Sequence, residues 1–183
     1  KNTNYALRSD MTKDEFVTEV LEGISPPPQY FEKNAKMNQS GYSDLDQVLS
    51  TGDQPLSADT FEALAKANEA LILDVRTQQD FVKTHIPGSI FIGLNGSFAP
   101  WVGALISDIN QPILLVVPEG MSKEAVTRLA RVGYDNTLGY LEGGMDAWII
   151  SGKETDHIVS ISASEFSEKS KSDTLSVLDV RKD

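Results

Sequence analysis

A short apolar run near the middle of the chain constrains the fold more than any other feature. Residues 113–117 are continuously apolar and rich in branched side chains, which is typical of a strand covered on both faces of a sheet. A turn containing Gly120 follows, and the apolar spacing after it predicts a helix with Ser122 as its N-cap and Gly133 at its end. Such a strand belongs in a parallel sheet with helices on both sides.

The segments around this run repeat the alternation of strand and helix from residue 54 to residue 152. The alternation predicts an α/β fold with a mostly parallel sheet, helices on both faces and right-handed crossovers. The expected strands are 55–56, 70–75, 89–92, 113–117 and 137–141, and the expected helices are 58–67, 78–83, 98–106, the one after Ser122, and 144–151.

The first 42 residues have no core pattern of their own. Residues 11–24 predict one amphipathic helix, in which Thr12 is the N-cap and Glu15 completes a capping box. A single helix of this kind is not stable alone. We therefore expect residues 1–42 to be the C-terminal tail of an upstream domain, followed by a linker over 43–53. The apolar side of the helix comprises Phe16, Val20, Leu21 and Ile24.

Two short motifs occur twice at the same offset. The run LSADTF at 56–61 is echoed by ISASEF at 161–166, and LDVR at 73–76 recurs at 178–181. Two matches at one offset indicate a duplicated domain. The expected units are therefore one complete domain at 54–152 and the truncated start of a second copy at 153–183.

Charge and cysteine content exclude several classes of function. The net charge of −11 argues against nucleic acid and anionic membranes as partners, since both need a basic surface. No apolar run approaches the ~20 residues of a membrane span. The chain has no cysteine, which excludes a disulfide, a thiolate nucleophile and a cysteine-based metal site and fits a cytoplasmic location. His85 and His157 are far apart, so we expect no metal or cofactor in this chain.

Two longer motifs resemble the signatures of the rhodanese (sulfurtransferase) homology domain. The run ILDVRTQQDFVKTHIPGSIFI resembles the first signature, an Asp-Val-Arg strand end followed by His-Ile-Pro-Gly-[Ala/Ser]. The run GYDNTLGYLEGGMDAW resembles the C-terminal signature Gly-[Tyr/Phe]-x-Asn-Val-x-x-Leu-x-Gly-Gly-x-x-x-Trp. The resemblance implies a three-layer sandwich around a five-stranded parallel sheet. The signature residues singled out here are Asp74, Arg76, His85, Gly143, Gly144 and Trp148.

Each signature residue has a structural reason for its type. Asp74 ends a buried strand, where its carboxylate can accept backbone N–H groups from the next turn, and Arg76 can pair with a nearby acid. His85 begins a turn through Pro87 and Gly88. Two consecutive glycines, 143 and 144, allow a tight entry into the last helix, which Trp148 is large enough to anchor.

Active members of this family carry Cys-x-x-Gly-x-Arg-Ser after the fourth strand. There the thiolate accepts sulfane sulfur as a persulfide, which backbone N–H groups and the arginine stabilise. Alignment on Gly120 places the cysteine position at Val117 and the arginine position at Ser122, whereas alignment on the following helix places them at Val116 and Met121. Neither alternative supplies a thiol or a cation.

The rest of the loop is equally unsuited to sulfur transfer. Pro118 removes one N–H donor, and Glu119 adds a negative charge where an anion would sit. Ser122 has no histidine base in sight, so we expect it to cap the helix instead of acting as a nucleophile. The resemblance therefore implies a degenerate active-site loop comprising Val117, Pro118, Glu119, Gly120, Met121 and Ser122.

The segments on either side of the complete domain suggest a parent protein. A tail such as PPPQYFEKNAKMNQSGY before a cysteine-free rhodanese copy, with another copy after it, is similar to fusion proteins in which a metallo-β-lactamase-fold domain precedes one or two rhodanese domains. Some are iron-dependent persulfide dioxygenases, and others are known only as metal-dependent hydrolases. This resemblance implies iron or zinc on the upstream domain, and flanking domains of the same chain or a second copy as partners.

Three readings of the function remain open at this point. The first is a catalytically inactive rhodanese-like module of a sulfur- or persulfide-metabolising metalloenzyme, serving domain assembly or substrate passage. The second is part of a working sulfurtransferase whose nucleophile lies on the second copy, beyond residue 183, and the third is a spacer without a ligand. The run GSFAPWVGALI bears on the choice, because its large apolar residues belong either to the core, which we favour, or to an interface. They are Phe98, Trp101, Leu105 and Ile106.

Overall fold

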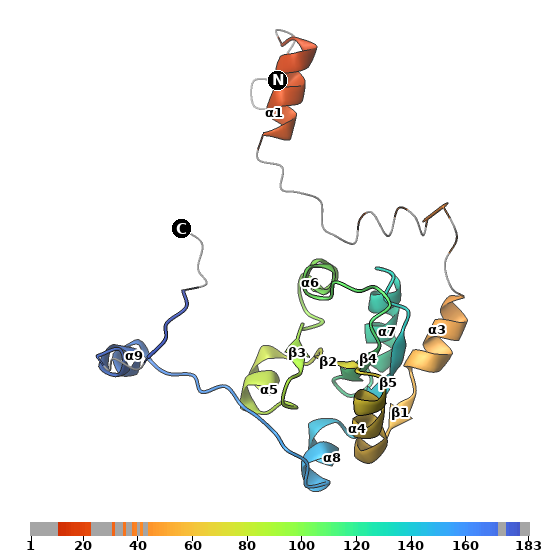
Figure 1. Ribbon diagram of the computed structural model, residues 1–183, viewed down its shortest axis with the longest axis vertical. Coiled ribbons are helices and arrows are strands. Elements are labelled where there is room, and N and C mark those ends of the chain that lie inside the picture. Colours follow the sequence, from red (N-terminus) through yellow and green to blue (C-terminus); the bar gives the residue numbers. More distant parts are fainter. Residues whose placement is uncertain are drawn as a thin grey trace.

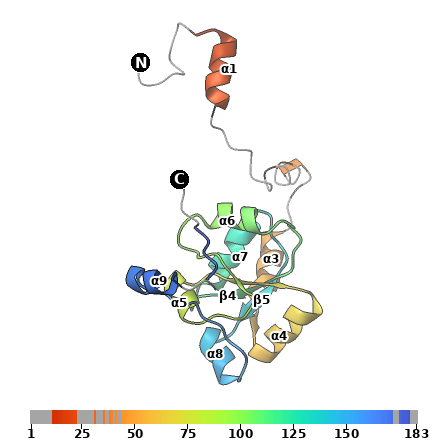
Figure 2. The same cartoon turned by 60° about the vertical axis from the view of Figure 1, so that its left-hand side comes forward.

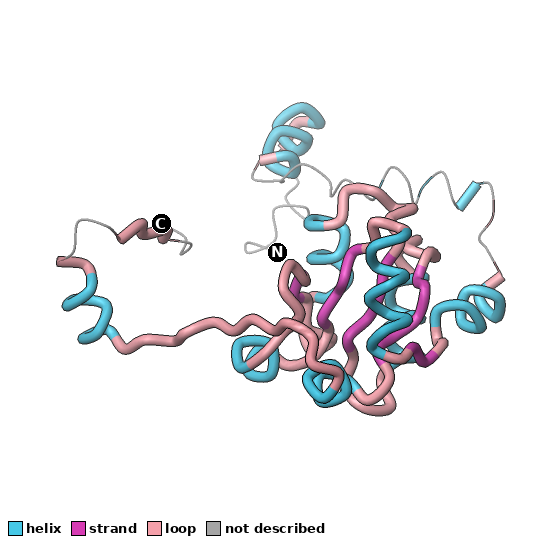
Figure 3. Tube along the Cα trace, turned by 60° about the horizontal axis from the view of Figure 1, so that its bottom comes forward, coloured by secondary structure: helices cyan, strands magenta, loops and turns pink. Residues whose placement is uncertain are grey.

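Five parallel strands form the centre of the structure, in the order β1-β5-β4-β2-β3 (Figure 1). Figure 3 shows these strands side by side between helices on both sides. The expected α/β sandwich with a five-stranded parallel sheet is therefore confirmed. The computed structural model describes residues 11–22, 31, 35, 38–39, 41, 44–171 and 175–179.

The elements follow the chain in the predicted alternation from β1 onward. The strands are β1 (Pro55–Leu56), β2 (Leu71–Asp74), β3 (Ile90–Phe91), β4 (Ile113–Val116) and β5 (Thr137–Leu141). The helices are α1 (Lys13–Leu21), α3 (Leu45–Gly52), α4 (Ala58–Ala67), α5 (Gln78–Lys83), α6 (Phe98–Leu105), α7 (Ser122–Ala130), α8 (Gly144–Ile150) and α9 (Ala163–Lys169).

The central strand β4 separates two apolar clusters because its side chains alternate between the faces of the sheet. Ile113 and Leu115 belong to the cluster covered by α3, α6 and α7. Leu114 and Val116 belong to the cluster covered by α4 and α8. All four side chains are fully buried, which confirms the prediction of a strand covered on both faces.

Helix α7 begins one residue earlier than its sequence suggests. Ser122 is the first helical residue and not the N-cap, which is Met121 and makes no side-chain capping bond. The preceding turn explains the shift: Gly120 takes a positive φ of 73°, and the N–H of Met121 donates to the carbonyl of Pro118 at 3.1 Å. The predicted capping role of Ser122 was therefore wrong.

The segment expected to be a linker, 43–53, contains the helix α3. Asp44 caps it by accepting the N–H of Asp46 at 2.9 Å, and Val48 is buried in the cluster with α7. Gly52 lies so close to α7 that an added Cβ would be 2.8 Å from Val126. Sequence analysis missed this helix because its apolar stripe is short. The stripe is buried only by packing against α7 and β5, which lie far away on the chain.

Strand β5 carries one more residue than the family signature allows. The signature has two residues between its Val and Leu, whereas three residues separate Thr137 from Leu141 in this chain. The structure accommodates the extra residue in an irregularity of the ladder, where Ile113 pairs with Thr137 but the next residue of β4 pairs with Gly139. Gly139 has a φ of 139°, and a Cβ there would be 2.7 Å from the carbonyl oxygen of Gln54.

Helix α1 forms where the sequence predicted a helix, and α9 begins within the repeated motif at 161–166; neither helix buries a residue. Thr12 and Glu15 make the expected capping box of α1. Ser162 and Glu165 cap α9 in the same way. Ile24, most of the proline-rich tail and the last two residues of the repeated LDVR motif lie outside the described residues. The division of the chain into domains remains a prediction.

Residues 175–179 form no regular strand. A strand needs a hydrogen-bonded neighbour. None of the helices that the structure describes is long and apolar enough to cross a membrane.

Candidate functional site

A pocket of about 640 Å³ opens at the carboxyl edge of the sheet, where β4 and β5 end. Ligands of open parallel sheets bind at this edge, so the pocket is the natural place to look for a site. It is lined by Arg76, Asp80, residues 117–120, Ser122 and residues 140–146.

The geometry discriminates between the two alignments of the degenerate loop. Val116 is a residue of β4, paired with Asp74, and its side chain is buried in the core. Val117 also lies in the core, in the cluster on the other face of the sheet, but unlike Val116 it lines the pocket as well. Likewise Ser122 lines the pocket, whereas Met121 packs against the core cluster. Both residues picked out by the alignment on Gly120, Val117 and Ser122, thus line the pocket, whereas Val116 and Met121 do not.

The pocket is poorly equipped to hold an anion. Pro118 has no N–H to offer, and the N–H of Met121 is already bonded to the Pro118 carbonyl. Arg76 is the one arginine among the described lining residues, and no lysine lines the pocket there. Like charges around a site disfavour an anion. The lining carboxylates are Asp80, Glu119, Glu142 and Asp146.

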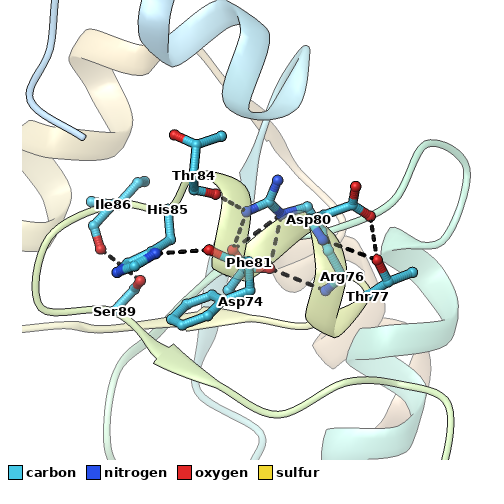
Figure 4. A network of polar contacts seen from close by, with 9 residues as sticks. All are labelled: Asp74, Arg76, Thr77, Asp80, Phe81, Thr84, His85, Ile86 and Ser89. Carbon is cyan, nitrogen blue, oxygen red and sulfur yellow. Dashed lines mark hydrogen bonds and ion pairs between the residues drawn. The ribbon is translucent and has the colours of Figure 1, made fainter. Parts of the chain in front are cut away.

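The charge of Arg76, which lines the pocket, is already paired with the carboxylate of Asp74 (Figure 4). Its Nε donates to Asp74 Oδ1 at 2.9 Å and its Nη2 to Oδ2 at 2.7 Å, while Nη2 also donates to the Thr84 carbonyl at 2.7 Å. The Asp74 carboxylate is fully buried and the Arg76 side chain nearly so. Asp74 also accepts the backbone N–H of Arg76 at 3.1 Å. The pair joins the end of β2 to the end of α5.

His85 lies beside this pair, and its ring and backbone hold the neighbouring segments in place. Its Nδ1 donates to the carbonyl of Phe81 at 2.8 Å (Figure 4), and its ring stacks on Phe81 with a centroid distance of 4.0 Å. The backbone of His85 exchanges two hydrogen bonds with Asp156, each 2.9 Å. His85 is therefore a buried structural residue. Its backbone binds the segment after α8, and its side chain binds α5.

The C-terminal signature residues build the other wall of the pocket. Gly143 and Gly144 have positive φ angles of 70° and 58°, and a Cβ at Gly143 would lie 2.9 Å from that of Ala147. Trp148 is buried, packs edge-on against Phe61 at 6.0 Å, and donates its indole N–H to the Glu154 carbonyl at 2.8 Å. The two glycines turn the chain, and the tryptophan anchors α8.

A charge cluster beside Trp148 was not found from the sequence. Lys153 bonds to Asp59 at 2.9 Å and to Glu62 at 2.7 Å, and its Nζ lies 5.4 Å from the Trp148 ring centroid. The hydrogen bonds from Lys153 and Lys66 lower the pKa of Glu62 to about 2. Asp59, Glu62 and Lys66 all lie on α4, but Lys153 is far from them on the chain, so no sequence spacing could have joined it to the cluster.

The apolar run in α6 divides between core and surface. Phe98 and Ile106 are buried, as we favoured, but Trp101 is 56% exposed and Leu105 is 50% exposed. A second pocket of about 650 Å³ opens beside these two residues, between α6 and the start of α5. The expectation of a core role was therefore wrong for Trp101 and Leu105.

No group of three or more His, Asp or Glu side chains that could hold a metal ion occurs among the described residues. The part of the chain that the structure describes thus offers no ligand set for iron or zinc.

Known proteins resemble this chain in sequence and in fold. The family model of the rhodanese-like domain matches residues 57–151. The thiosulfate sulfurtransferase GlpE of Pseudomonas aeruginosa is 30% identical over 99 residues, which cover 50% of this chain and 86% of the relative. A crystal structure of the Alr3790 protein from Anabaena sp. matches with a TM-score of 0.50 at 20% identity, covering 63% of this chain and 98% of that one. A Rhodanese_3 like domain of the same Anabaena protein has a TM-score of 0.46 at 21% identity and covers 51% and 98%.

Proposed function

The chain belongs to the rhodanese-like domain family, and we propose that it is a catalytically inactive member that serves domain assembly or substrate passage in a larger sulfur- or persulfide-metabolising enzyme. One observation carries this proposal. Val117 occupies the pocket position that corresponds to the family's nucleophile.

Sulfur transfer by this family needs a thiolate that can become a persulfide. The 183 residues contain no cysteine, so no residue of this chain can form that bond. Loss of the cation at position 122 and of a donor at Pro118 points the same way. Each change would remove a group that could stabilise an anionic persulfide. Together with the negative charge of Glu119, these changes support the inference that the pocket no longer carries out sulfur transfer.

The parent enzyme is the part of the proposal that extends furthest. The resemblance of residues 1–42 to the end of a metallo-β-lactamase-fold domain supports an upstream domain that holds iron or zinc. No ligand set for that metal is contained in the described residues, so the metal would depend on residues outside them. The absence of cysteine supports a reducing, cytoplasmic location.

The alternative function is that of a working sulfurtransferase with its nucleophile on the second copy. The repeated motifs at 161–166 and 178–181 favour it, because they begin another rhodanese-like unit. In that case the parent would transfer sulfur although this chain does not.

A sulfurtransferase assay separates the two functions. The chain is incubated with thiosulfate and cyanide, and thiocyanate is measured against a heat-inactivated sample, with a thiosulfate sulfurtransferase as positive control. We expect no thiocyanate above background from this chain. Formation of thiocyanate by the chain itself would overturn the inactive assignment, whereas thiocyanate from the parent alone would favour the alternative.

A further inference from the structure

Helix α6 is apolar on all sides, although one side faces solvent. Its sequence, FAPWVGAL, contains no charged residue and no polar side chain. Phe98, Val102 and Gly103 are buried, while Trp101 and Leu105 are exposed on the opposite side. A helix that is hydrophobic all round is normally buried. We call the side formed by Pro100, Trp101, Ala104 and Leu105 the outer face of α6; these four residues are exposed.

The surroundings of the outer face favour an acidic partner. Ser97, the N-cap of α6, makes no side-chain capping bond, so the positive end of the helix dipole is left for another group. Arg131 lines a hollow beside residues 96–100. Arg128 lines it too, but its guanidinium already pairs with Glu124 and donates to the Leu94 carbonyl at 2.7 Å. Anions are stabilised at such a helix start, and more so next to arginines.

Helix α1 has the complementary chemistry. None of its residues is buried, and Leu21 is 61% exposed and Val17 42% exposed on its apolar side. The other side is acidic, with Asp14, Glu19 and the C-cap Glu22. An apolar stripe with carboxylates along its margin fits an apolar surface flanked by Arg131.

The chain allows the two helices to meet. Figures 1 and 2 show α6 and the start of α3 at the same end of the domain, with α1 beyond that end. Residues 23–43 separate α1 from the cap of α3, and a chain of this length spans up to about 70 Å when extended. Linkage within one chain gives the contact an effective concentration in the millimolar range.

We propose that the outer face of α6 is a docking surface for an acidic amphipathic helix, and that α1 of the same chain is its occupant. Docking covers Trp101 and Leu105 and places the carboxylates of α1 beside Arg131. It gives the rhodanese-like domain a fixed attachment to whatever precedes it in the chain. The inference goes beyond the proposed function and does not depend on sulfur chemistry.

The two tryptophans allow a direct test in the intact chain. Because the chain has no cysteine, Met11→Cys places a single nitroxide at the start of α1, before its N-cap Thr12 and outside the apolar stripe of the helix. In ¹⁵N-labelled protein, the indole N–H signal of Trp101 reports the outer face. The indole N–H signal of Trp148 serves as the internal reference. Trp148 belongs to α8, which lies at the other end of the domain (Figure 1), and its indole N–H donates to the Glu154 carbonyl. Since α1 is only about 14 Å long, a nitroxide on it comes near Trp101 in any docked orientation.

We expect the nitroxide to attenuate the Trp101 signal more than the Trp148 signal. Leu21→Asp, on the apolar side of α1, should abolish this difference, whereas Thr18→Asp adds the same charge on the polar side and should preserve it. Equal attenuation of the two tryptophan signals in the nitroxide-labelled chain without either Asp substitution would overturn the proposal. Attenuation that appears when nitroxide-bearing unlabelled chain is mixed with ¹⁵N-labelled chain would assign the surface to a second copy and would also overturn it.

Discussion

Arg76 binds Asp74 through two of its guanidinium nitrogens, with Nη2 at 2.7 Å from Oδ2 and Nε at 2.9 Å from Oδ1. The two residues are two positions apart on the chain. The Arg76 side chain, just after the end of β2, therefore folds back onto the carboxylate of Asp74, the last residue of the strand. A cation that lines the candidate pocket is in this way neutralised, and a signature residue acts as a strut for the fold. The pair also carries the clearest stability prediction.

Substitution of Asp74 by Asn should destabilise the domain strongly. The change leaves the Arg76 guanidinium in a nearly buried position without its counter-charge, and breaking a buried pair costs about 3–5 kcal/mol. Urea unfolding followed by circular dichroism measures the loss. Lys66→Ala removes the exposed pair with Glu62 and is the control, with an expected loss below about 1 kcal/mol. Equal effects of the two variants would contradict the structural role of Asp74.

Substitution of Thr137 by Val should stabilise the domain. The Thr137 hydroxyl is fully buried in β5 and has no hydrogen-bond partner, and an unsatisfied buried group costs about 1–3 kcal/mol. Valine has nearly the same shape, and the family signature has valine at this position. Thermal unfolding should show a higher midpoint for Thr137→Val but not for Thr137→Ser, which keeps the hydroxyl. A lower midpoint for the valine variant would mean that the hydroxyl has a partner, such as a buried water.

The native loop should not bind a divalent anion. Glu119 repels it by ~1 kcal/mol or more at a separation near 4 Å, and Pro118 withholds a donor. Crystals soaked in thiosulfate or sulfate should show no ordered anion at residues 117–122. An anion bound to the loop amides would contradict the view that this pocket has lost its ligand.

Rebuilding the loop should restore part of the chemistry. The combination of Val117→Cys, Pro118→Arg, Glu119→Ser and Ser122→Arg supplies a thiol, a donor and cations on a backbone that keeps the turn at Gly120. Mass spectrometry after incubation with thiosulfate should detect a persulfide on the rebuilt loop. Val116→Cys in place of Val117→Cys is the matched control, because residue 116 lies inside β4, and it should stay unmodified. Modification at 116 but not at 117 would reverse the alignment.

The cluster around Lys153 should make the domain sensitive to acid. The pKa of Glu62 is lowered to about 2 from 4.5, first by the hydrogen bond from Lys153. A lowered carboxyl pKa contributes stability that is complete above about 4.5 and is lost as the pH falls towards 2. The free energy of unfolding, measured at pH 7 and at pH 3, should fall less between the two pH values for Glu62→Gln than for the native chain. An unchanged loss would indicate that other carboxylates dominate acid unfolding.

Limited proteolysis should leave a resistant piece that begins at α3. Sequence analysis placed the start of the complete domain at residue 54, but Val48 and Gly52 of α3 are packed against the core. Protease should therefore cut on the N-terminal side of Asp44 and on the C-terminal side of Asp156, the residue whose backbone pairs with His85. Mass spectrometry of the fragments can locate both cuts. A cut between α3 and β1 in folded protein would contradict this packing.

The sequence alone determined the alternation of strands and helices from β1 to α8, and the family. The continuous apolar run at β4, the glycine pair before α8 and the two signature motifs are local patterns, and local patterns decide which segments become buried strands or capped helices. The absence of a nucleophile was equally readable, since it depends only on which residue types are present. Neither result required knowing which residues touch.

Only the tertiary structure decided which side of each element is covered. It showed that α3 packs on α7, that Val117 and not Val116 lines the pocket, and that Trp101 and Leu105 face solvent while Phe98 of the same helix is buried. It also brought Lys153 to Glu62 across most of the domain. These relationships join residues far apart on the chain. They follow from how helices pack on a twisted sheet, and no periodicity within a single segment records that packing.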